Sequence, residues 1–184
     1  ESVRLQQIVD HLLQLASLEA AGRLKQPQAL SLTELLAGEL QALAPQLGTR
    51  RVTPVATLPQ AMVAGDAFLL RQALRNILQN AIDFTADEGC ISLQLQPVAN
   101  GWQLQIANDG PPVPDYALPR LFDRFYSLPR PHGPKSSGLG LALTRTIVQL
   151  HGGDITLANQ PPGVCVTLRL PAMDAANPLA RVLG

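Results

Sequence analysis

One segment constrains the fold of this chain more than any other: residues 70–85 read LRQALRNILQNAIDFT. Its apolar side chains recur with helical spacing: Leu70, Ala73, Leu74, Ile77, Leu78, Ala81 and Ile82. This spacing predicts an amphipathic helix with one buried face. Asn76 and Asn80 lie four residues apart, so both amides are expected on the opposite face. Asparagine is a poor helix former, and two of them indicate either a solvated polar face or amide ligands for an ion such as Mg²⁺.

A glycine-rich segment, residues 135–143, reads KSSGLGLAL and runs into a second apolar helical stretch. One of its two serines is expected to cap that helix. Gly138 and Gly140 allow the backbone to approach a bulky anion closely. The free N–H groups of a helix start attract negative charge, and Lys135 adds to this attraction. The segment lacks the third glycine of the dinucleotide fingerprint and the Gly-Lys-Ser/Thr run of a Walker loop, so these two motifs are excluded.

Three stretches with turn and loop character lie between these two segments. Residues 106–115, IANDGPPVPD, predict a polar turn after an apolar strand. Residues 116–126, YALPRLFDRFY, predict a short helix rich in phenylalanine. Residues 127–137 hold several prolines and basic side chains, which predicts a mobile lid.

In this order, the asparagine helix, the strand ending in Asp-Gly, the Phe-rich segment and the GLGLA helix start resemble the N, G1, F and G2 boxes of sensor histidine kinases. The resemblance covers about residues 32–171, and the strings NAIDFT, PDYAL, RFYSLPR and KSSGLGLA are similar to those of CreC-type sensor kinases. It implies the α/β two-layer sandwich shared with type II topoisomerase, Hsp90 and MutL ATPases, in which helices cover one face of a mixed, mostly antiparallel sheet. The order of helix and strand patterns favours the same architecture.

The chain divides into four parts by pattern. Residues 1–23 predict one long amphipathic helix, which resembles the second helix of the family's dimerisation hairpin. Residues 24–31 are interpreted as a linker, and residues 32–171 as the ATP-binding catalytic domain. Residues 172–184 form a tail that we expect to be weakly ordered.

Local signals predict where several elements begin and turn. Ser31 and Glu34 form a capping box at the start of a helix, and Asp66 is a suitable N-cap for the asparagine helix. Asn100-Gly101 is a strong hairpin signal, and a second hairpin is expected around Gly163. The expected strands are residues 52–56, 61–64, 90–96, 102–106, 154–158 and 164–170.

The resemblance implies a Mg-ATP site, in which Asn80 binds Mg²⁺ and Asn76 lies on the phosphate side of the nucleotide. Related ATP hydrolases carry a glutamate at the position of Asn76 as the general base for water, and an amide cannot take up a proton. The site is therefore expected to hold ATP for a histidine nucleophile, because phosphoryl transfer depends mainly on positioning and charge neutralisation. The residues expected to contact the nucleotide are Asn76, Asn80, Asp83, Phe84, Asn108, Asp109, Gly110, Val113, Phe125, Tyr126, Arg130, Lys135, Ser137, Gly138, Leu139, Gly140 and Leu141.

The second box departs from the family's pattern. Asn108 stands where the family has its adenine-reading aspartate, and Pro112 replaces a glycine, so the loop must take another path. Asp109 is an alternative adenine contact. Asp83 stands where many relatives carry a basic side chain. It would repel phosphates unless water or Mg²⁺ lies between, and a plain surface charge is the alternative interpretation.

The third box departs as well, since Ser127 follows the aromatic pair where the family often has an arginine that touches the γ-phosphate. Arg124, Arg130 and Lys135 are the candidates to replace it. His11 lies on the first helix without the His-Glu-x-x-x-Pro pattern of the phosphorylated helix, so no catalytic residue is expected in this chain. His151 is placed at a helix end, where a partial positive charge is favourable.

The formal net charge is zero and there is no dense basic block, which argues against nucleic acid as a partner. We expect the cytoplasmic ATP-binding part of a bacterial inner-membrane sensor kinase, which reaches the membrane only through a preceding segment. It would form a homodimer through its own hairpin, phosphorylate a histidine outside this chain, and pass the phosphate to a response regulator. One alternative is a degenerate nucleotide-binding or docking module with weak or no ATP binding, supported by Asn108, Pro112 and Ser127. The other alternative is a self-contained ATP hydrolase, against which Asn76 argues.

Overall fold

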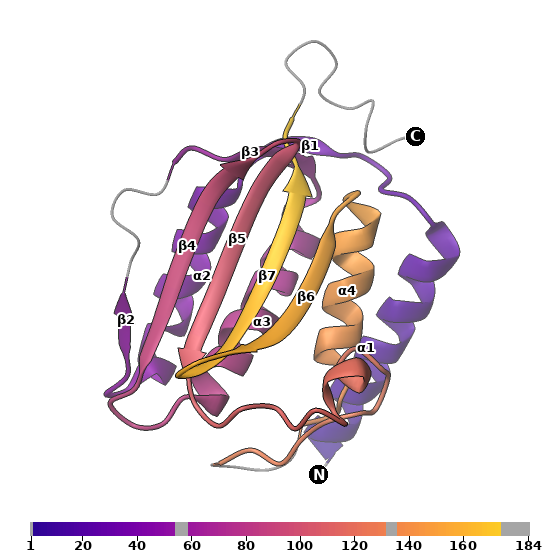
Figure 1. Ribbon diagram of the computed structural model, residues 1–184. Coiled ribbons are helices and arrows are strands. Elements are labelled where there is room, and N and C mark those ends of the chain that lie inside the picture. Colours follow the sequence, from indigo (N-terminus) through magenta and orange to yellow (C-terminus); the bar gives the residue numbers. More distant parts are fainter. Residues whose placement is uncertain (1, 54–58, 132–135, 174–184) are drawn as a thin grey trace.

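The computed structural model describes residues 2–53, 59–131 and 136–173. A five-stranded sheet is covered on one face by helices α2, α3 and α4, none of the described helices covers its other face, and α1 lies beside α4 (Figure 1). This arrangement confirms the predicted two-layer α/β sandwich preceded by one long helix. The elements are α1 (Ser2–Ala21), β1 (Gln28–Ser31), α2 (Leu32–Leu47), β2 (Arg51–Thr53), β3 (Met62–Gly65), α3 (Ala67–Phe84), β4 (Cys90–Val98), β5 (Gly101–Asp109), the 3-10 turn η1 (Leu118–Arg120), α4 (Gly140–Leu150), β6 (Asp154–Gln160) and β7 (Gly163–Pro171).

The large sheet has the strand order β2-β4-β5-β7-β6. Only the β2–β4 pair is parallel among these strands, and the other pairs are antiparallel. Both predicted hairpins are present, because Val98 pairs with Gly101 at one turn and Gln160 pairs with Gly163 at the other. The small sheet consists of β1 and β3, paired antiparallel.

Helix α3 is the central element of the core. Its predicted apolar stripe is buried throughout, and Leu70 and Leu74 have no exposed surface. All of the stripe except Ala73 packs in one cluster with α2 and the covered face of the sheet, and Ala73 packs in a second cluster with α1 and α4. The predicted N-cap is also present, since the Asp66 carboxylate accepts a hydrogen bond from the Leu69 backbone N–H at 3.0 Å. This stripe therefore fixes which side of α3 is left for polar side chains.

Helix α1 is attached to the domain by a separate apolar cluster. Leu15 is 1% exposed and packs with Leu143 and Ile147 of α4. The amides of Gln14 and Gln72 exchange two hydrogen bonds of 2.5 and 2.9 Å between α1 and α3. These contacts fix α1 against α3 and α4. Within the part of the chain that the structure describes, no helix is long and apolar enough to cross a membrane.

Three local predictions differ from the structure. The expected linker, residues 24–31, contains strand β1, because Gln28–Ser31 finds a partner in β3 that no local signal reveals. The expected Phe-rich helix is reduced to the single turn Leu118–Arg120. Helix α4 begins at Gly140 without a side-chain cap, and the Ser137 hydroxyl accepts instead from the Leu139 N–H at 3.4 Å. In the tail, residues 174–184 lie outside the described residues.

His151 is a further difference, because it is not placed for a positive charge. Its side chain is 1% exposed, and its Nε2 accepts a hydrogen bond of 3.0 Å from the Asp66 backbone N–H. The ring proton is therefore on Nδ1, which donates to the Ile147 carbonyl at 2.7 Å. Burial lowers the pKa of His151, against the opposing effects of the Ile147 hydrogen bond and the Asp66 charge. The imidazole is thus a neutral link between α4 and the start of α3.

Candidate functional site

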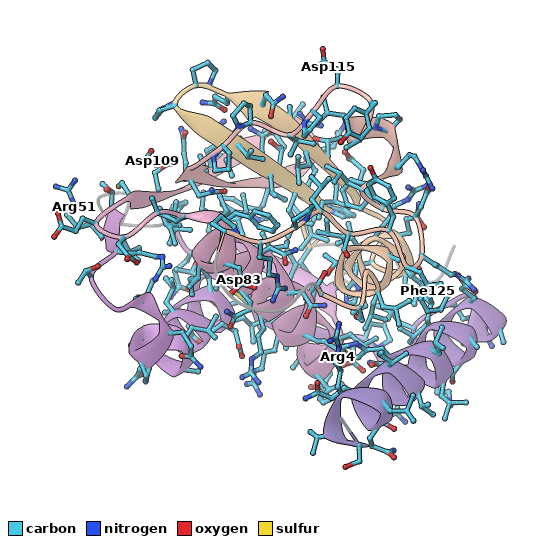
Figure 2. All side chains as sticks on the ribbon, turned by 90° about the horizontal axis from the view of Figure 1, so that it is seen from below. Arg4, Arg51, Asp83, Asp109, Asp115 and Phe125 are labelled. Carbon is cyan, nitrogen blue, oxygen red and sulfur yellow. The ribbon has the colours of Figure 1, made fainter. Side chains whose placement is uncertain are left out.

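A cavity of about 960 Å³ opens at the lower end of the sheet, between α1, α3, the first turn of α4 and the loop between β5 and α4. Figure 2 views the molecule from this end. Its inner part is apolar and includes Ile77, Ala81, Ile106 and Val164. Its outer part carries the cations Arg4 and Arg130, and no carboxylate lines it among the described residues. An apolar slot with a cationic mouth suits a flat ring that bears an anionic tail.

The two asparagines of α3 both line this cavity. The Asn76 side-chain NH₂ donates to the Gly140 carbonyl and to the Thr144 hydroxyl, each at 3.3 Å. Asn76 therefore holds the start of α4 against α3 and keeps its own oxygen for a ligand. The Asn80 amide has no hydrogen bond to another described residue, so its oxygen can coordinate a cation.

The described residues contain no group of three or more His, Cys, Asp or Glu side chains that could hold a metal ion. A divalent ion beside Asn80 would consequently take most of its ligands from phosphate oxygens and water, as Mg²⁺ does in nucleotide sites. The groups of α3 that could bind a cation here are the neutral amide oxygens of Asn76 and Asn80. This fits an ion that arrives with its anionic ligand.

Asn108 stands near the end of β5, where it lines the apolar slot and is 9% exposed. Its Nδ2 is buried without a hydrogen-bond partner among the described residues. Packing requires a glycine at position 110, because a Cβ atom there would lie 2.4 Å from the Phe84 carbonyl oxygen. Phe84 itself lines the cavity.

The neighbouring Asp109 is turned away from the cavity. Its Oδ2 accepts a hydrogen bond of 3.0 Å from the Cys90 backbone N–H, at the beginning of β4. Figure 2 shows Asp109 at the strand ends, well separated from Asp83 and Arg4. Asp109 therefore does not line the cavity, contrary to its expected position as an alternative adenine contact.

Two charged residues meet at the edge of the cavity. Arg130 Nη2 lies 2.9 Å from Asp83 Oδ2, an ion pair whose angle falls outside hydrogen-bond geometry. The two side chains are 21% and 16% exposed. The other oxygen of Asp83 accepts from the Gln79 amide at 2.9 Å. Asp83 is thus neither a free surface charge nor an uncompensated repulsion for an anion, because an arginine from the predicted lid neutralises it.

The other two predicted arginine substitutes have different positions. Arg124 pairs with Glu19 of α1, outside the cavity. Lys135 lies outside the described residues. Of the two candidates that the structure describes, Arg130 lines the cavity and Arg124 does not.

The two aromatic residues of the third box, Phe125 and Tyr126, point in different directions. Phe125 has a φ of 63° and is 59% exposed, so its ring is outside the cavity, contrary to prediction. Tyr126 lines the cavity, and the Arg120 guanidinium carbon lies 4.4 Å from its ring centroid. The left-handed backbone at Phe125 turns the chain, so the Phe125 ring faces solvent while the Tyr126 ring faces the cavity.

The glycine-rich segment packs against this aromatic pair. Gly138 has a φ of +72°, and a Cβ atom there would lie 2.5 Å from the Phe125 carbonyl carbon. The Phe125 N–H donates to the Gly138 carbonyl at 2.9 Å. Ser137, Gly138, Gly140 and Leu141 line the cavity, whereas the Leu139 side chain is 1% exposed and belongs to the interior. Packing against the Phe125 backbone therefore requires a glycine at position 138.

Val113 lines the cavity, and its position is fixed by a residue that the sequence did not reveal. The Asn159 amide of β6 accepts from the Val113 N–H and donates to the Val113 carbonyl, both at 2.8 Å. This pair of hydrogen bonds ties the proline-rich loop to the sheet edge. Pro112, in the same loop, also lines the cavity.

Helix α1 supplies a wall that the sequence analysis missed. Arg4, Gln7 and His11 line the cavity together with Val3 and Ile8. The polar members of this set follow the spacing i, i+3 and i+7 on one helix face, and this pattern was a readable signal. Figure 2 shows Arg4 extending from α1 toward α3. The Nδ1 atom of His11 is buried without a hydrogen-bond partner among the described residues.

Comparison with protein families gives one match over most of the folded part. Residues 65–174 match the model described as histidine kinase-, DNA gyrase B-, and HSP90-like ATPase. The chain is 41% identical over 171 residues to the sensor protein CreC of Escherichia coli, covering 92% of this chain and 36% of that protein. It is 33% identical over 194 residues to the sensor protein SphS of Synechococcus elongatus, covering 99% and 47%. The chain thus spans between a third and a half of these relatives.

Solved structures show the same architecture. The mycobacterial sensor histidine kinase MprB superposes with a TM-score of 0.70 at 27% identity, covering 79% of this chain and 97% of that one. Full-length ShkA in complex with AMPPNP superposes with a TM-score of 0.79 at 25% identity, covering 95% of this chain and 37% of that one.

Proposed function

Because the chain belongs to the histidine kinase-, DNA gyrase B-, and HSP90-like ATPase family, as the ATP-binding catalytic domain of a sensor histidine kinase, we propose that its cavity holds Mg-ATP for phosphoryl transfer to a histidine. That histidine lies on a segment outside these residues. The observation that carries the proposal is one cavity whose lining combines apolar side chains and Asn108 with Asn80, Arg4 and Arg130.

Different lining residues would bind the base, the Mg²⁺ ion and the phosphates of the nucleotide. The apolar slot would take the base, with Asn108 at its polar end. The Asn80 oxygen would coordinate Mg²⁺, whose role is to bridge phosphate oxygens and neutralise their charge. Arg130 would donate to the phosphates from the lid, and the glycine-rich segment would give them room beside the start of α4.

The residues that line the cavity favour phosphoryl transfer to a histidine over hydrolysis of ATP by water. The NH₂ group of Asn76 is engaged by Gly140 and Thr144, and an amide cannot take a proton from water. No carboxylate lines the cavity among the described residues, so the usual general base of the family's hydrolases is missing there. A positioned phosphate and a nearby nucleophile suffice for transfer.

The wider function rests on the relatives' names and is part of the proposal. CreC and SphS are named sensor proteins and come from bacteria. We propose that the whole protein is an inner-membrane sensor kinase with this domain in the cytoplasm. It would form a homodimer through a hairpin that includes α1, and a response regulator would receive the phosphate. Residues 1–23 would belong to that hairpin and residues 32–171 to the catalytic domain.

Thermal melting with and without Mg-ATP tests the proposal. A ligand that binds only the native state at 100 times its Kd stabilises it by about 2.7 kcal/mol, which corresponds to a shift of about 5–10 °C at this chain length. Asn80→Ala should reduce the Mg²⁺-dependent part of this shift. Gln94→Ala, an exposed position on the sheet, is the control and should keep the full shift.

A second candidate function is a degenerate module that signals by docking and binds nucleotide weakly or not at all. Asn108, Pro112 and Ser127 favour it, because each replaces a residue that the family uses at the nucleotide. An unchanged melting temperature at millimolar Mg-ATP would support this module and contradict the proposed site.

A further inference from the structure

The side chain of Asn108 has more hydrogen-bonding capacity than its surroundings use. It is 9% exposed, lines the apolar slot, and has a buried Nδ2 without a partner among the described residues. Buried amides normally make hydrogen bonds, and an unsatisfied one carries a desolvation cost. In this orientation the NH₂ group does not face the open cavity, so a ligand can satisfy it only after the amide turns over.

An amide and a carboxylate read a ligand differently. An ionised carboxylate only accepts hydrogen bonds, whereas an amide presents one accepting oxygen and one donating NH₂ group. No hydrogen bond to a described residue fixes which end of Asn108 faces the slot. Turning the amide by half a rotation consequently breaks no hydrogen bond within the described protein.

Purine bases present two complementary edges at this point. A 6-amino purine such as adenine offers an N–H donor at position 6 and an acceptor at N1. A 6-oxo purine such as hypoxanthine or guanine offers an acceptor at position 6 and an N–H donor at N1. One orientation of an amide pairs with the first edge, and the opposite orientation pairs with the second, as in the reading of bases by their Watson–Crick edges.

We infer that Asn108 makes the site permissive at position 6 of the purine, so that 6-oxo purine nucleotides bind alongside adenine nucleotides. The inference rests on the proposed function, since it requires a nucleotide in this cavity. The apolar slot around Asn108, formed by Ile77, Ala81, Ile106 and Val164, holds either ring without distinguishing the two edges. A carboxylate at position 108 would repel a 6-oxo group and restore the preference for adenine.

Calorimetric titration with Mg-ATP and Mg-ITP tests this inference, because the two bases differ only at position 6 and N1. For the wild-type protein we expect Kd values within about threefold of each other. For Asn108→Asp we expect at least a tenfold preference for ATP, since sites built for one hydrogen-bond pattern reject the other strongly. Asn100→Asp, the same chemical change at an exposed turn, is the control and should leave the ratio at its wild-type value.

Asn108→Ala provides a second variant if the buried carboxylate impairs folding. It removes both ends of the amide and should weaken ATP and ITP to the same extent. A wild-type preference for ATP of tenfold or more overturns the inference while leaving the proposed function intact, as does an unchanged ratio in folded Asn108→Asp. Failure of the wild-type protein to bind either nucleotide overturns the proposed function, and the inference with it.

Discussion

Replacing Arg130 with glutamine should weaken Mg-ATP binding and, separately, destabilise the empty protein. Arg130 lines the cavity while its Nη2 lies 2.9 Å from Asp83 Oδ2. Its Nε is buried without a hydrogen-bond partner among the described residues, so a phosphate oxygen would be met by the terminal NH₂ groups of the guanidinium. We expect Arg130 to bridge Asp83 and the nucleotide, because complete release would leave a largely buried carboxylate without its counter-ion.

The magnitudes follow from these contacts. A hydrogen bond to a charged group is worth about 1.5–3 kcal/mol, and the lower end applies at an open cavity mouth, which gives roughly a tenfold increase in the Kd of ATP. Breaking a buried pair costs about 3–5 kcal/mol and an exposed one about 0.2–1 kcal/mol. The pair is 21% and 16% exposed and Gln79 still supports Asp83, so we expect a loss of about 1–2 kcal/mol in the free energy of unfolding.

Calorimetry with ATP and adenosine, together with urea denaturation, measures the two effects independently. Adenosine lacks the phosphates, so its affinity should not change in Arg130→Gln. Adding Asp83→Asn should recover most of the stability, because no carboxylate is left unpaired, yet the ATP affinity should stay low. Arg169→Gln is the matched control, since Arg169 pairs with Asp154 at 3.4 Å in an exposed position outside the cavity. Equal weakening of ATP and adenosine, or recovery of ATP binding in the double variant, would refute the reasoning.

Two further predictions concern the framework of the site. Burial lowers the pKa of His151, so the unfolded chain takes up the proton more readily, and stability should fall as the pH drops below about 6.5. Urea denaturation from pH 7.5 to 5 should show a shallower fall for His151→Gln, and identical slopes would exclude this titration as the cause. Gly138→Ala should cost about 2–3 kcal/mol, because it combines a φ of +72° with a Cβ only 2.5 Å from Phe125. In the same denaturation experiments Gly38→Ala, an open position within α2, should be neutral or stabilising, and equal costs for the two glycines would contradict the packing argument.

Features encoded by neighbours in sequence could be predicted. The apolar spacing of residues 70–85 specifies helix α3 and its buried face, because helical periodicity depends on residues three and four apart. Asp66 specifies where that helix begins, and Asn100-Gly101 specifies a hairpin turn. The positions of Asn76 and Asn80 on the wall of the cavity follow from the same periodicity. In each case the signal and its consequence lie within a few residues of each other.

Features that depend on distant partners could not be predicted in this way. Strand β1 forms because β3 pairs with it, and α1 becomes a wall of the cavity because Leu15 packs on α4. The position of Asp109 depends on the Cys90 N–H of another strand, and the left-handed turn at Phe125 accompanies its packing against Gly138.

The sequence by itself determined the helix α3 with its polar residues, the hairpin turns, and the order in which helices and strands follow each other. The tertiary structure decided that Asp83 is neutralised by Arg130, that His151 is neutral, and that Asn108 has no fixed hydrogen-bond partner among the described residues. The physical reason is that the charge and hydrogen-bonding state of a side chain depend on the atoms that folding brings within a few ångströms. Those atoms belong to residues that are far away along the chain, so no local pattern records them.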